Sequence, residues 1–329
     1  MIRLNHPTAN DGYDEIRATV DRMFAESPDG IGVAELEELG LLELLHDAET
    51  RRAALRAVFE GQGAALAVAG TTEALVLEGL PGLDGVPPAA STAVLFDALP
   101  DAYLAVQVQG HMPTHYLLES REEAGSVRVL DAVTAAARVV RTVSESVEVV
   151  AVSAELDGKA TPIAGAQPHL LSVRSSLAVA LQVAGMCDHL LELGRDHVQT
   201  RHQFGRPIGS FQAVQHLLAD TAVTIAAAHA TNDNALVALE DPDEAPLAAL
   251  VSAGAAVRAF DATSRATQQV LGAIGYTREH EFHKYLHRGL LLMRLLGSTT
   301  IDRRLAVVAR AHGATAPARS WFDDFEEGH

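Results

Sequence analysis

The residues best suited to chemistry lie in the stretch 201–220, R-H-Q-F-G-R-P-I-G-S-F-Q-A-V-Q-H-L-L-A-D. A helix-like run precedes it, two glycines and a proline interrupt that run, and helical spacing starts again at Phe211. Such a turn presents backbone N–H groups, the guanidinium of Arg201 and the aromatic rings of Phe204 and Phe211 in one place. These groups suit a ligand that combines a pyrophosphate with a flat ring. The alternative is an ordinary corner between two helices, with Arg201 in solvent and both rings in the core.

This stretch resembles a motif of the flavin-dependent acyl-CoA dehydrogenase family, R-x-x-F-G-x-P-I-x-x-F-Q…L-A-D. Residues 269–277, Q-V-L-G-A-I-G-Y-T, resemble a second segment of that family, Q-x-x-G-G-x-G-Y-T, with Ala273 in place of its second glycine. The resemblance extends over about residues 170–310 and is faint before them. It implies the fold of the family, an FAD cofactor and an acyl-CoA substrate.

The resemblance also implies which residues bind the cofactor. In a homomeric member of the family, the two segments reach across the subunit interface to the FAD of the neighbouring subunit, where they touch its pyrophosphate and adenosine part. The matching cofactor-binding residues of this chain are Arg201, Gln203, Phe204, Phe211, Gln212, Gln269 and Gly272.

The Glu carboxylate that removes the α-proton of the substrate in this family is absent from both of its known positions. Such a base must be placed over the substrate and needs an appropriate pKa. In many members it follows the tyrosine of the G-Y-T segment, and counting from Tyr276 places Leu296 at that position. Other members place it on the helix before the arginine motif, next to an Arg, and the corresponding residues here are Ser175 and Ser176. Arg174 is out of register by two residues, on another face of the helix. We therefore expect no catalytic residue in this chain.

Other side chains that could act as bases or metal ligands have ordinary explanations. Glu279 and Glu281 begin the last helical segment, where acidic side chains complement the helix dipole. His280, His283 and His287 recur at roughly one-turn spacing, but no further ligand of suitable geometry can be recognised. We expect a solvated histidine-rich face here and no metal site.

Composition bounds the fold and excludes several functions. The chain has 329 residues, of which 48% are hydrophobic and only 5% aromatic, which favours packed helices with a modest sheet. A net charge of −18 argues against binding to nucleic acid or to anionic membranes. We recognise neither a signal peptide nor an uncharged apolar stretch long enough to span a membrane. Cys187 is the single cysteine, so no disulfide can form within the chain and we expect a reducing, cytoplasmic location, with Cys187 as a small buried hydrophobic residue.

The period of the apolar residues changes twice along the chain and indicates its organisation. Helical spacing in residues 1–80 predicts an N-terminal helical domain, and period-two runs in residues 89–164 predict a reduced β-domain after a Gly- and Pro-rich linker. Residues 168–312 predict a C-terminal four-helix bundle, followed by an arm at 313–329. The expected fold is mainly α and similar to that of acyl-CoA dehydrogenases.

Individual elements follow from the same patterns. The predicted helices are residues 13–24, 33–45, 51–68 with an interruption at Gly61 and Gly63, 170–198, 211–239, 246–272 and 279–311. The predicted strands are residues 103–108, 126–130, 138–143 and 147–153.

The predicted β-domain departs from the family. There it holds the flavin ring through a T-E-P-x-x-G-S-D-like strand and a W-I-T-like strand, and neither sequence occurs here. The chain keeps the segments that a family member gives to its neighbour and lacks those that it uses itself. It thus resembles the non-catalytic subunit of actinobacterial heteromeric (α2β2) acyl-CoA dehydrogenases, which act on CoA thioesters of steroid side chains.

This resemblance implies a homologous catalytic subunit as the partner, with the acyl-CoA mainly on that partner and the FAD site completed by this chain. Two alternatives remain open at this point. The chain could be a flavin monooxygenase-like member of the same fold, or a degenerate, non-enzymatic assembly partner.

Overall fold

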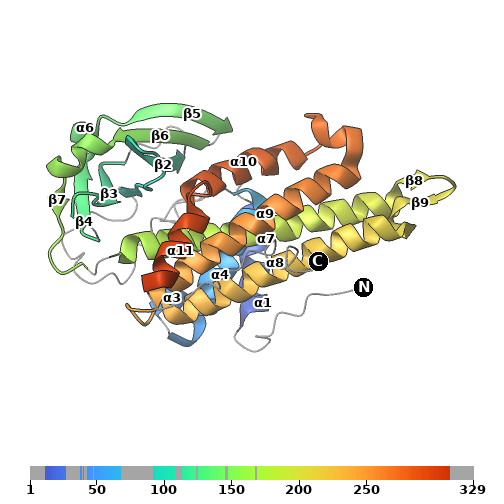
Figure 1. The fold of residues 1–329 in the computed structure, drawn as a ribbon, viewed down its shortest axis with the longest axis horizontal. Coiled ribbons are helices and arrows are strands. Elements are labelled where there is room, and N and C mark those ends of the chain that lie inside the picture. Colours follow the sequence, from blue (N-terminus) through green and yellow to red (C-terminus); the bar gives the residue numbers. More distant parts are fainter. Residues whose placement is uncertain are drawn as a thin grey trace, which may run out of the picture.

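The computed structural model describes residues 12–26, 38, 40, 43–46, 48–67, 92–108, 113–123, 125–144, 147–166 and 169–311. Within this part, long helices lie side by side and a group of short strands lies at one end of them (Figure 1). Most of the predicted helix at 33–45, nearly all of the linker and the whole arm at 313–329 fall outside the described residues.

The N-terminal part contains α1 (Tyr13–Glu26), α3 (Glu43–His46) and α4 (Ala48–Ala65). The helix predicted at 13–24 is confirmed by α1, whereas the predicted interruption at Gly61 and Gly63 is wrong, because α4 continues through both. Gly63 serves a close crossing with a later helix, α7 (Leu170–Thr200), and not a break in α4. A Cβ on Gly63 would lie 1.8 Å from the carbonyl oxygen of Gln182, and one on Gly185 would lie 2.0 Å from that of Glu60. Glycine at these positions lets the two backbones touch.

The strands form two small sheets. One has the order β1-β3-β4-β7 and the other β2-β6-β5. All of their pairings are antiparallel except that of β1 with β3. The bounds are β1 (Thr92–Val94), β2 (Ala102–Val108), β3 (His115–Glu119), β4 (Val127–Asp131), β5 (Arg138–Ser144), β6 (Val147–Ser153) and β7 (Thr161–Pro162), with a short helix α6 (Ala132–Ala135) after β4. The four predicted strands correspond to β2, β4, β5 and β6; β1, β3 and β7 were not predicted.

Strand β2 is buried on both of its faces. Tyr103 and Ala105 pack into a core within the strand region. Leu104, which lies between them in the sequence, packs into the core of the helical bundle. Successive side chains point to opposite faces of a strand, so a strand buried on both sides reads as a continuous apolar run. The β2-β6-β5 sheet is thereby fixed to the helices.

The C-terminal part consists of α7, α8 (Gln212–Ala238), α9 (Ala245–Leu271), α10 (Phe282–Leu295) and α11 (Ile301–Ala311). The single helix predicted at 279–311 is wrong, because the segment divides into α10 and α11 around Gly297, whose φ of 69° favours glycine. Two stretches, Leu170–Thr200 and Ala245–Tyr276, are long and apolar enough to cross a membrane by length and composition alone. The apolar window of the first is 83% buried inside the structure and that of the second 56%, as in core helices.

Candidate functional site

The arginine motif forms a hairpin beyond the end of α7. Strands β8 (His202–Gln203) and β9 (Arg206–Pro207) pair through a two-residue turn, and the hairpin projects from the end of the bundle (Figure 1). The turn residues Phe204 and Gly205 have φ values of 53° and 78°. Two positive φ angles in succession are typical of the tight hairpin turn that suits the twist of paired strands. A left-handed conformation is normal for glycine but uncommon for phenylalanine.

Aromatic and cationic groups gather at this hairpin. The Phe204 side chain is 91% exposed, and its ring meets that of Phe211 edge-on at 6.2 Å between centroids. The guanidinium carbon of Arg206 lies 4.2 Å from the centroid of the Phe211 ring. A large apolar ring that is both exposed and held in a sparsely populated backbone conformation points to a ligand or a partner.

Arg201 lies at the base of the hairpin, directly after the last turn of α7. Its carbonyl accepts a hydrogen bond of 2.8 Å from the N–H of Ile208, which closes the hairpin. Its side chain is exposed and makes no hydrogen bond or ion pair within the part of the chain that the structure describes. Burial, followed by the charges of His280 and Arg201, lowers the pKa of His197, which shows that these side chains share one region.

The second motif segment lies at the same end of the bundle. Gln269 is exposed on the last turn of α9, and Gly272 ends that helix with a φ of 61°. The Cα of Gly194 on α7 faces Val270, which places the end of α9 beside the second half of α7. After Gly272 follows a 3-10 turn, η4 (Gly272–Tyr276), whose Tyr276 is 77% exposed.

The seven predicted cofactor-binding residues are therefore at or next to one end of the bundle. Arg201, Gln203, Phe204, Gln212, Gln269 and Gly272 are exposed, and Phe211 is half-buried. Arg206 completes this group and was missed. The F-G pair could have identified the hairpin turn, and pairing across it would have placed Arg206 opposite Gln203.

The two positions at which the resemblance places a catalytic Glu are buried in this structure. Leu296 at the end of α10 is only 2% exposed and belongs to the main apolar core. Ser175 is buried on α7, and its hydroxyl donates to the carbonyl of Leu171 at 2.5 Å, so it is held within its own helix. Neither side chain is available to take a proton from a substrate.

The histidines of the last helical segment form no recognisable metal site. The rings of His283 and His287 lie edge-on at 6.1 Å, and Nδ1 of His283 is 2.7 Å from the carbonyl of His280. Among the described residues there is no group of three or more His, Cys, Asp or Glu side chains that could hold a metal ion.

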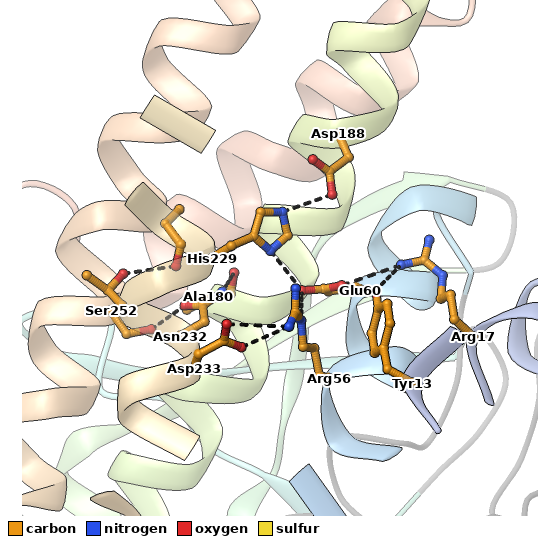
Figure 2. Close-up of polar contacts among 12 residues, drawn as sticks. Tyr13, Arg17, Arg56, Glu60, Ala180, Asp188, His229, Asn232, Asp233 and Ser252 are labelled. Atoms are coloured by element: carbon orange, nitrogen blue, oxygen red, sulfur yellow. Dashed lines mark hydrogen bonds and ion pairs between the residues drawn. The ribbon is translucent and has the colours of Figure 1, made fainter. Parts of the chain in front are cut away.

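A buried charged cluster joins α1, α4, α7 and α8 and was also missed from the sequence (Figure 2). At its centre is Glu60, fully buried, with Oε1 at 2.9 Å from Nδ1 of His229 and 3.0 Å from Nε of Arg56. Nε2 of His229 is 2.9 Å from Oδ2 of Asp188. The hydroxyl of Tyr13 donates to Glu60.

Electrostatics keep the central pair of this cluster charged. Burial alone would raise the pKa of Glu60, but the hydrogen bond and charge of His229, together with Arg56, lower it from 4.5 to about 2. Burial alone would lower the pKa of His229, but Asp188 and Glu60 raise it from 6.5 to about 10. Because Glu60 and His229 both have charged partners within the protein, the cluster connects α1, α4, α7 and α8 through polar contacts.

Comparison with known proteins identifies the fold. Residues 174–312 match the model of the acyl-CoA dehydrogenase C-terminal domain. Acyl-CoA dehydrogenase FadE34 of Mycobacterium tuberculosis is 35% identical over 127 residues, which cover 38% of this chain and 18% of that protein. Acyl-CoA dehydrogenase IpdE2 of the same organism is 38% identical over 124 residues, covering 38% of this chain and 37% of that protein. The matches thus span well under half of these relatives.

Solved structures resemble nearly the whole chain. The ChsE4–ChsE5 complex from Mycobacterium tuberculosis has a TM-score of 0.70 at 21% identity, covering 94% of this chain and 99% of the matched one. The Tcur3481–Tcur3483 steroid ACAD G363A variant has a TM-score of 0.68 at 22% identity, covering 93% and 100%. At these identities the likeness establishes a common fold.

Proposed function

Since the chain has the acyl-CoA dehydrogenase fold and carries the C-terminal domain of that family at residues 174–312, we propose that it is a non-catalytic subunit of an FAD-dependent acyl-CoA dehydrogenase. It completes the FAD site of a homologous, catalytically complete partner in a hetero-oligomer of the α2β2 type. The assembly introduces an α,β double bond into an acyl-CoA that is held mainly by the partner.

One contrast carries this proposal. The motif residues that a family member would offer to its neighbour are exposed at the end of the bundle, whereas the positions of its own base are buried or engaged. Arg201 presents a guanidinium without a partner in the described part of the chain, and Phe204 presents an almost fully exposed ring. Leu296 is sealed in the core.

The exposed groups fit an FAD molecule held by another subunit. A guanidinium is a preferred partner of a pyrophosphate, because its N–H donors match the phosphate oxygens in pairs. Phe204 supplies a flat apolar face, and the guanidinium of Arg206 lies over the neighbouring ring of Phe211. FAD would supply the hydride acceptor for dehydrogenation, and this chain would position and shield part of it.

A steroid side-chain CoA thioester is the substrate class that we propose for the assembly. The solved structures that resemble this chain include one described as a steroid ACAD, and that structure and ChsE4–ChsE5 both pair two different chains. We place the assembly in the cytoplasm, where CoA thioesters are made and used.

Replacement of Arg201 tests the proposal. Arg201→Ala, co-purified with the partner, should lose about 1.5–3 kcal/mol of FAD binding, the usual worth of a charged hydrogen bond, or roughly tenfold to a hundredfold in affinity. Phe204→Ala should also weaken FAD binding, through lost packing, and should leave the melting temperature unchanged because the ring packs little within the chain.

Arg22→Ala is the matched control, because Arg22 is exposed on α1, away from the hairpin. Flavin absorbance per complex and the melting temperature are measured for all variants. An unchanged flavin affinity in Arg201→Ala would remove the site from this hairpin. A variant that fails to fold would favour the alternative in which this stretch is only an ordinary corner between two helices. A complex without flavin in the wild type would favour the non-enzymatic assembly partner.

A further inference from the structure

The outward side of α8 carries an uncharged stripe along its whole length. The stripe consists of exposed residues at three- or four-residue spacing, and we call it the α8 stripe: Gln212, His216, Ala219, Val223, Ala227, Ala230, Asn234 and Val237. None of them is charged, although the chain has a net charge of −18. Val223 is 70% exposed and Val237 is 55% exposed. Because the mean spacing is close to the helical repeat, the stripe runs straight along one side of α8 for roughly 40 Å.

The opposite side of α8 is already packed against the rest of the bundle. Ile225 and Ala228 belong to the main apolar core, and Leu236 belongs to the core that includes α1 and α4. A helix that is apolar on both sides is normally covered on both sides. The exposed side of α9 is of the ordinary kind, since its Arg265 forms an ion pair with Asp261 in solvent. The α8 stripe therefore has the character of a face that another chain covers.

The charges at the two ends of α8 are opposite in sign. From Arg201 to Ala219 the chain has two arginines and no carboxylate, and the first turn of α8 contains no acidic side chain. An acidic turn follows the other end, with these residues exposed: Glu240, Asp241, Asp243 and Glu244. This order is the reverse of the one that a single helix favours, because the helix dipole stabilises anions at the N-terminus and cations at the C-terminus. It suits an antiparallel neighbour that has the same distribution of charge.

We propose that the α8 stripe is the contact between two copies of this chain, packed antiparallel about a two-fold axis that passes between Val223 and Ala227. In such a contact the same surface is used twice, so each residue that meets another must also be met by it. The spacing of the stripe fulfils this condition. Val223 of one copy meets the smaller Ala227 of the other, and the reverse holds on the far side of the axis.

The pairs farther from the axis also match in size and polarity. Ala219 meets Ala230, and two small side chains allow the helices to approach closely. One turn farther, His216 meets Asn234, and both side chains can donate and accept hydrogen bonds. At each end, the arginines of the hairpin then lie toward the acidic turn of the other copy. A parallel arrangement would bring like charges together at both ends.

This contact goes beyond the proposed function and does not depend on flavin. In a hetero-oligomer that contains two copies of this chain, the α8 stripe joins those two copies to each other. The tip of the hairpin, with its exposed Phe204, is left for the FAD of the homologous partner. A measurement of mass therefore tests this contact, and a measurement of flavin tests the proposed function.

The mass of the full chain, purified without a partner and followed by analytical ultracentrifugation, measures the contact. We expect a dimer. Val223→Glu should weaken the dimer on the order of a hundredfold or more, because it buries two unpaired carboxylates beside the axis. Val307→Glu is the matched control and should leave the dimer unchanged, because Val307 is 61% exposed on α11 and lies outside the stripe. Glu forms helices at least as well as Val, so neither variant should lose helical structure.

Cysteine cross-linking tests the antiparallel arrangement. Cys187 is the single cysteine and is fully buried, so cysteines added at the surface should react without it. Chains with Ala219→Cys and chains with Ala230→Cys, mixed and oxidised in air, should form a disulfide-linked dimer with each other. Neither variant should link to itself. The two Ala219 positions would be separated by roughly 16 Å along the helices, whereas a disulfide joins Cα atoms that are at most about 7 Å apart.

Several results would overturn the proposal. A chain that stays monomeric at every concentration would do so, and so would a dimer that Val223→Glu leaves intact. Linkage of Ala219→Cys mainly to itself would rule out the antiparallel packing. If the chain alone were a monomer and Val223→Glu only broke its complex with the homologous partner, the stripe would bind that partner and not a second copy. Should Val223→Glu fail to fold, cross-linking decides, since it changes only exposed alanines.

Discussion

Removing the charge of Glu60 tests how much the buried cluster stabilises the helical part of the protein. Glu60→Gln keeps the size and shape of the side chain but removes the anion around which three cationic groups gather. His229, Arg56 and Arg17 lie within 2.9, 3.0 and 3.6 Å of its carboxylate oxygens. In the variant these cations would face a neutral amide at a fully buried position, and the two N–H donors of that amide would point at existing donors.

The expected loss follows from the pKa of the carboxyl group. A folded-state pKa of about 2 against an unfolded value of 4.5 corresponds to about 3 kcal/mol of stability above pH 4.5, at about 1.4 kcal/mol per pKa unit. Breaking a buried pair by removing one partner typically costs about 3–5 kcal/mol, which agrees. We therefore expect Glu60→Gln to lower the free energy of unfolding of the helical part by about 3 kcal/mol near pH 6.

Urea unfolding followed by circular dichroism measures this loss. Glu192→Gln is the matched control, because Glu192 makes an exposed ion pair with Arg195 at 3.6 Å on α7. Exposed pairs contribute about 0–1 kcal/mol, so the control should unfold nearly like wild type. If Glu60→Gln lowered the free energy of unfolding no more than Glu192→Gln does, the cluster would not stabilise the packing of these helices as described.

Three further predictions concern the same helices. Glu60 contributes its full stabilisation above pH 4.5 and loses it as the pH falls toward 2, whereas His229 contributes its full stabilisation below pH 6.5 and loses it as the pH rises toward 10. The free energy of unfolding, measured from pH 3 to 10, should therefore be greatest between about pH 4.5 and 6.5. Stability that does not fall between pH 6.5 and 10 would contradict the role of His229. Gly185→Ala should destabilise by more than the about 1–3 kcal/mol typical of overpacking, because its Cβ would lie 2.0 Å from a backbone oxygen of α4, whereas Gly194→Ala, with no atom closer than 3.4 Å, should melt like wild type. Leu296→Glu should lower the melting temperature by burying a carboxylate and should give no acyl-CoA dehydrogenation in a dye-reduction assay of the chain alone; turnover would show that the base position is functional.

Local patterns in the sequence were sufficient for elements with one regular period. The apolar spacing of α1 and the apolar, β-branched runs of β2 and β6 identified these elements, because each has at least one face that must be buried. Strand β3, His115–Glu119, was missed because its H-Y-L-L-E sequence contains no β-branched residue. The role of Gly63 inside a continuous α4 could not be predicted, since it lies against Gln182, which is far away in the sequence.

The candidate site was predictable only where it resembled a known motif. Arg201 and Phe204 were found through their spacing, but the exposure of Phe204 and its left-handed conformation required the hairpin geometry. The Glu60 cluster was not found, because its contacts depend on how separate helices meet. Periodicity marks a residue as core-facing and does not say whether a charge placed there is neutralised.

The flavin content of this chain, purified alone and after co-expression with a complete acyl-CoA dehydrogenase subunit of the same organism, tests the central claim most directly. We predict a chain that is colourless and inactive alone, and a yellow hetero-oligomer that dehydrogenates an acyl-CoA when the partner is present. A yellow homo-oligomer that reduces dye with acyl-CoA in the absence of any partner would contradict the account.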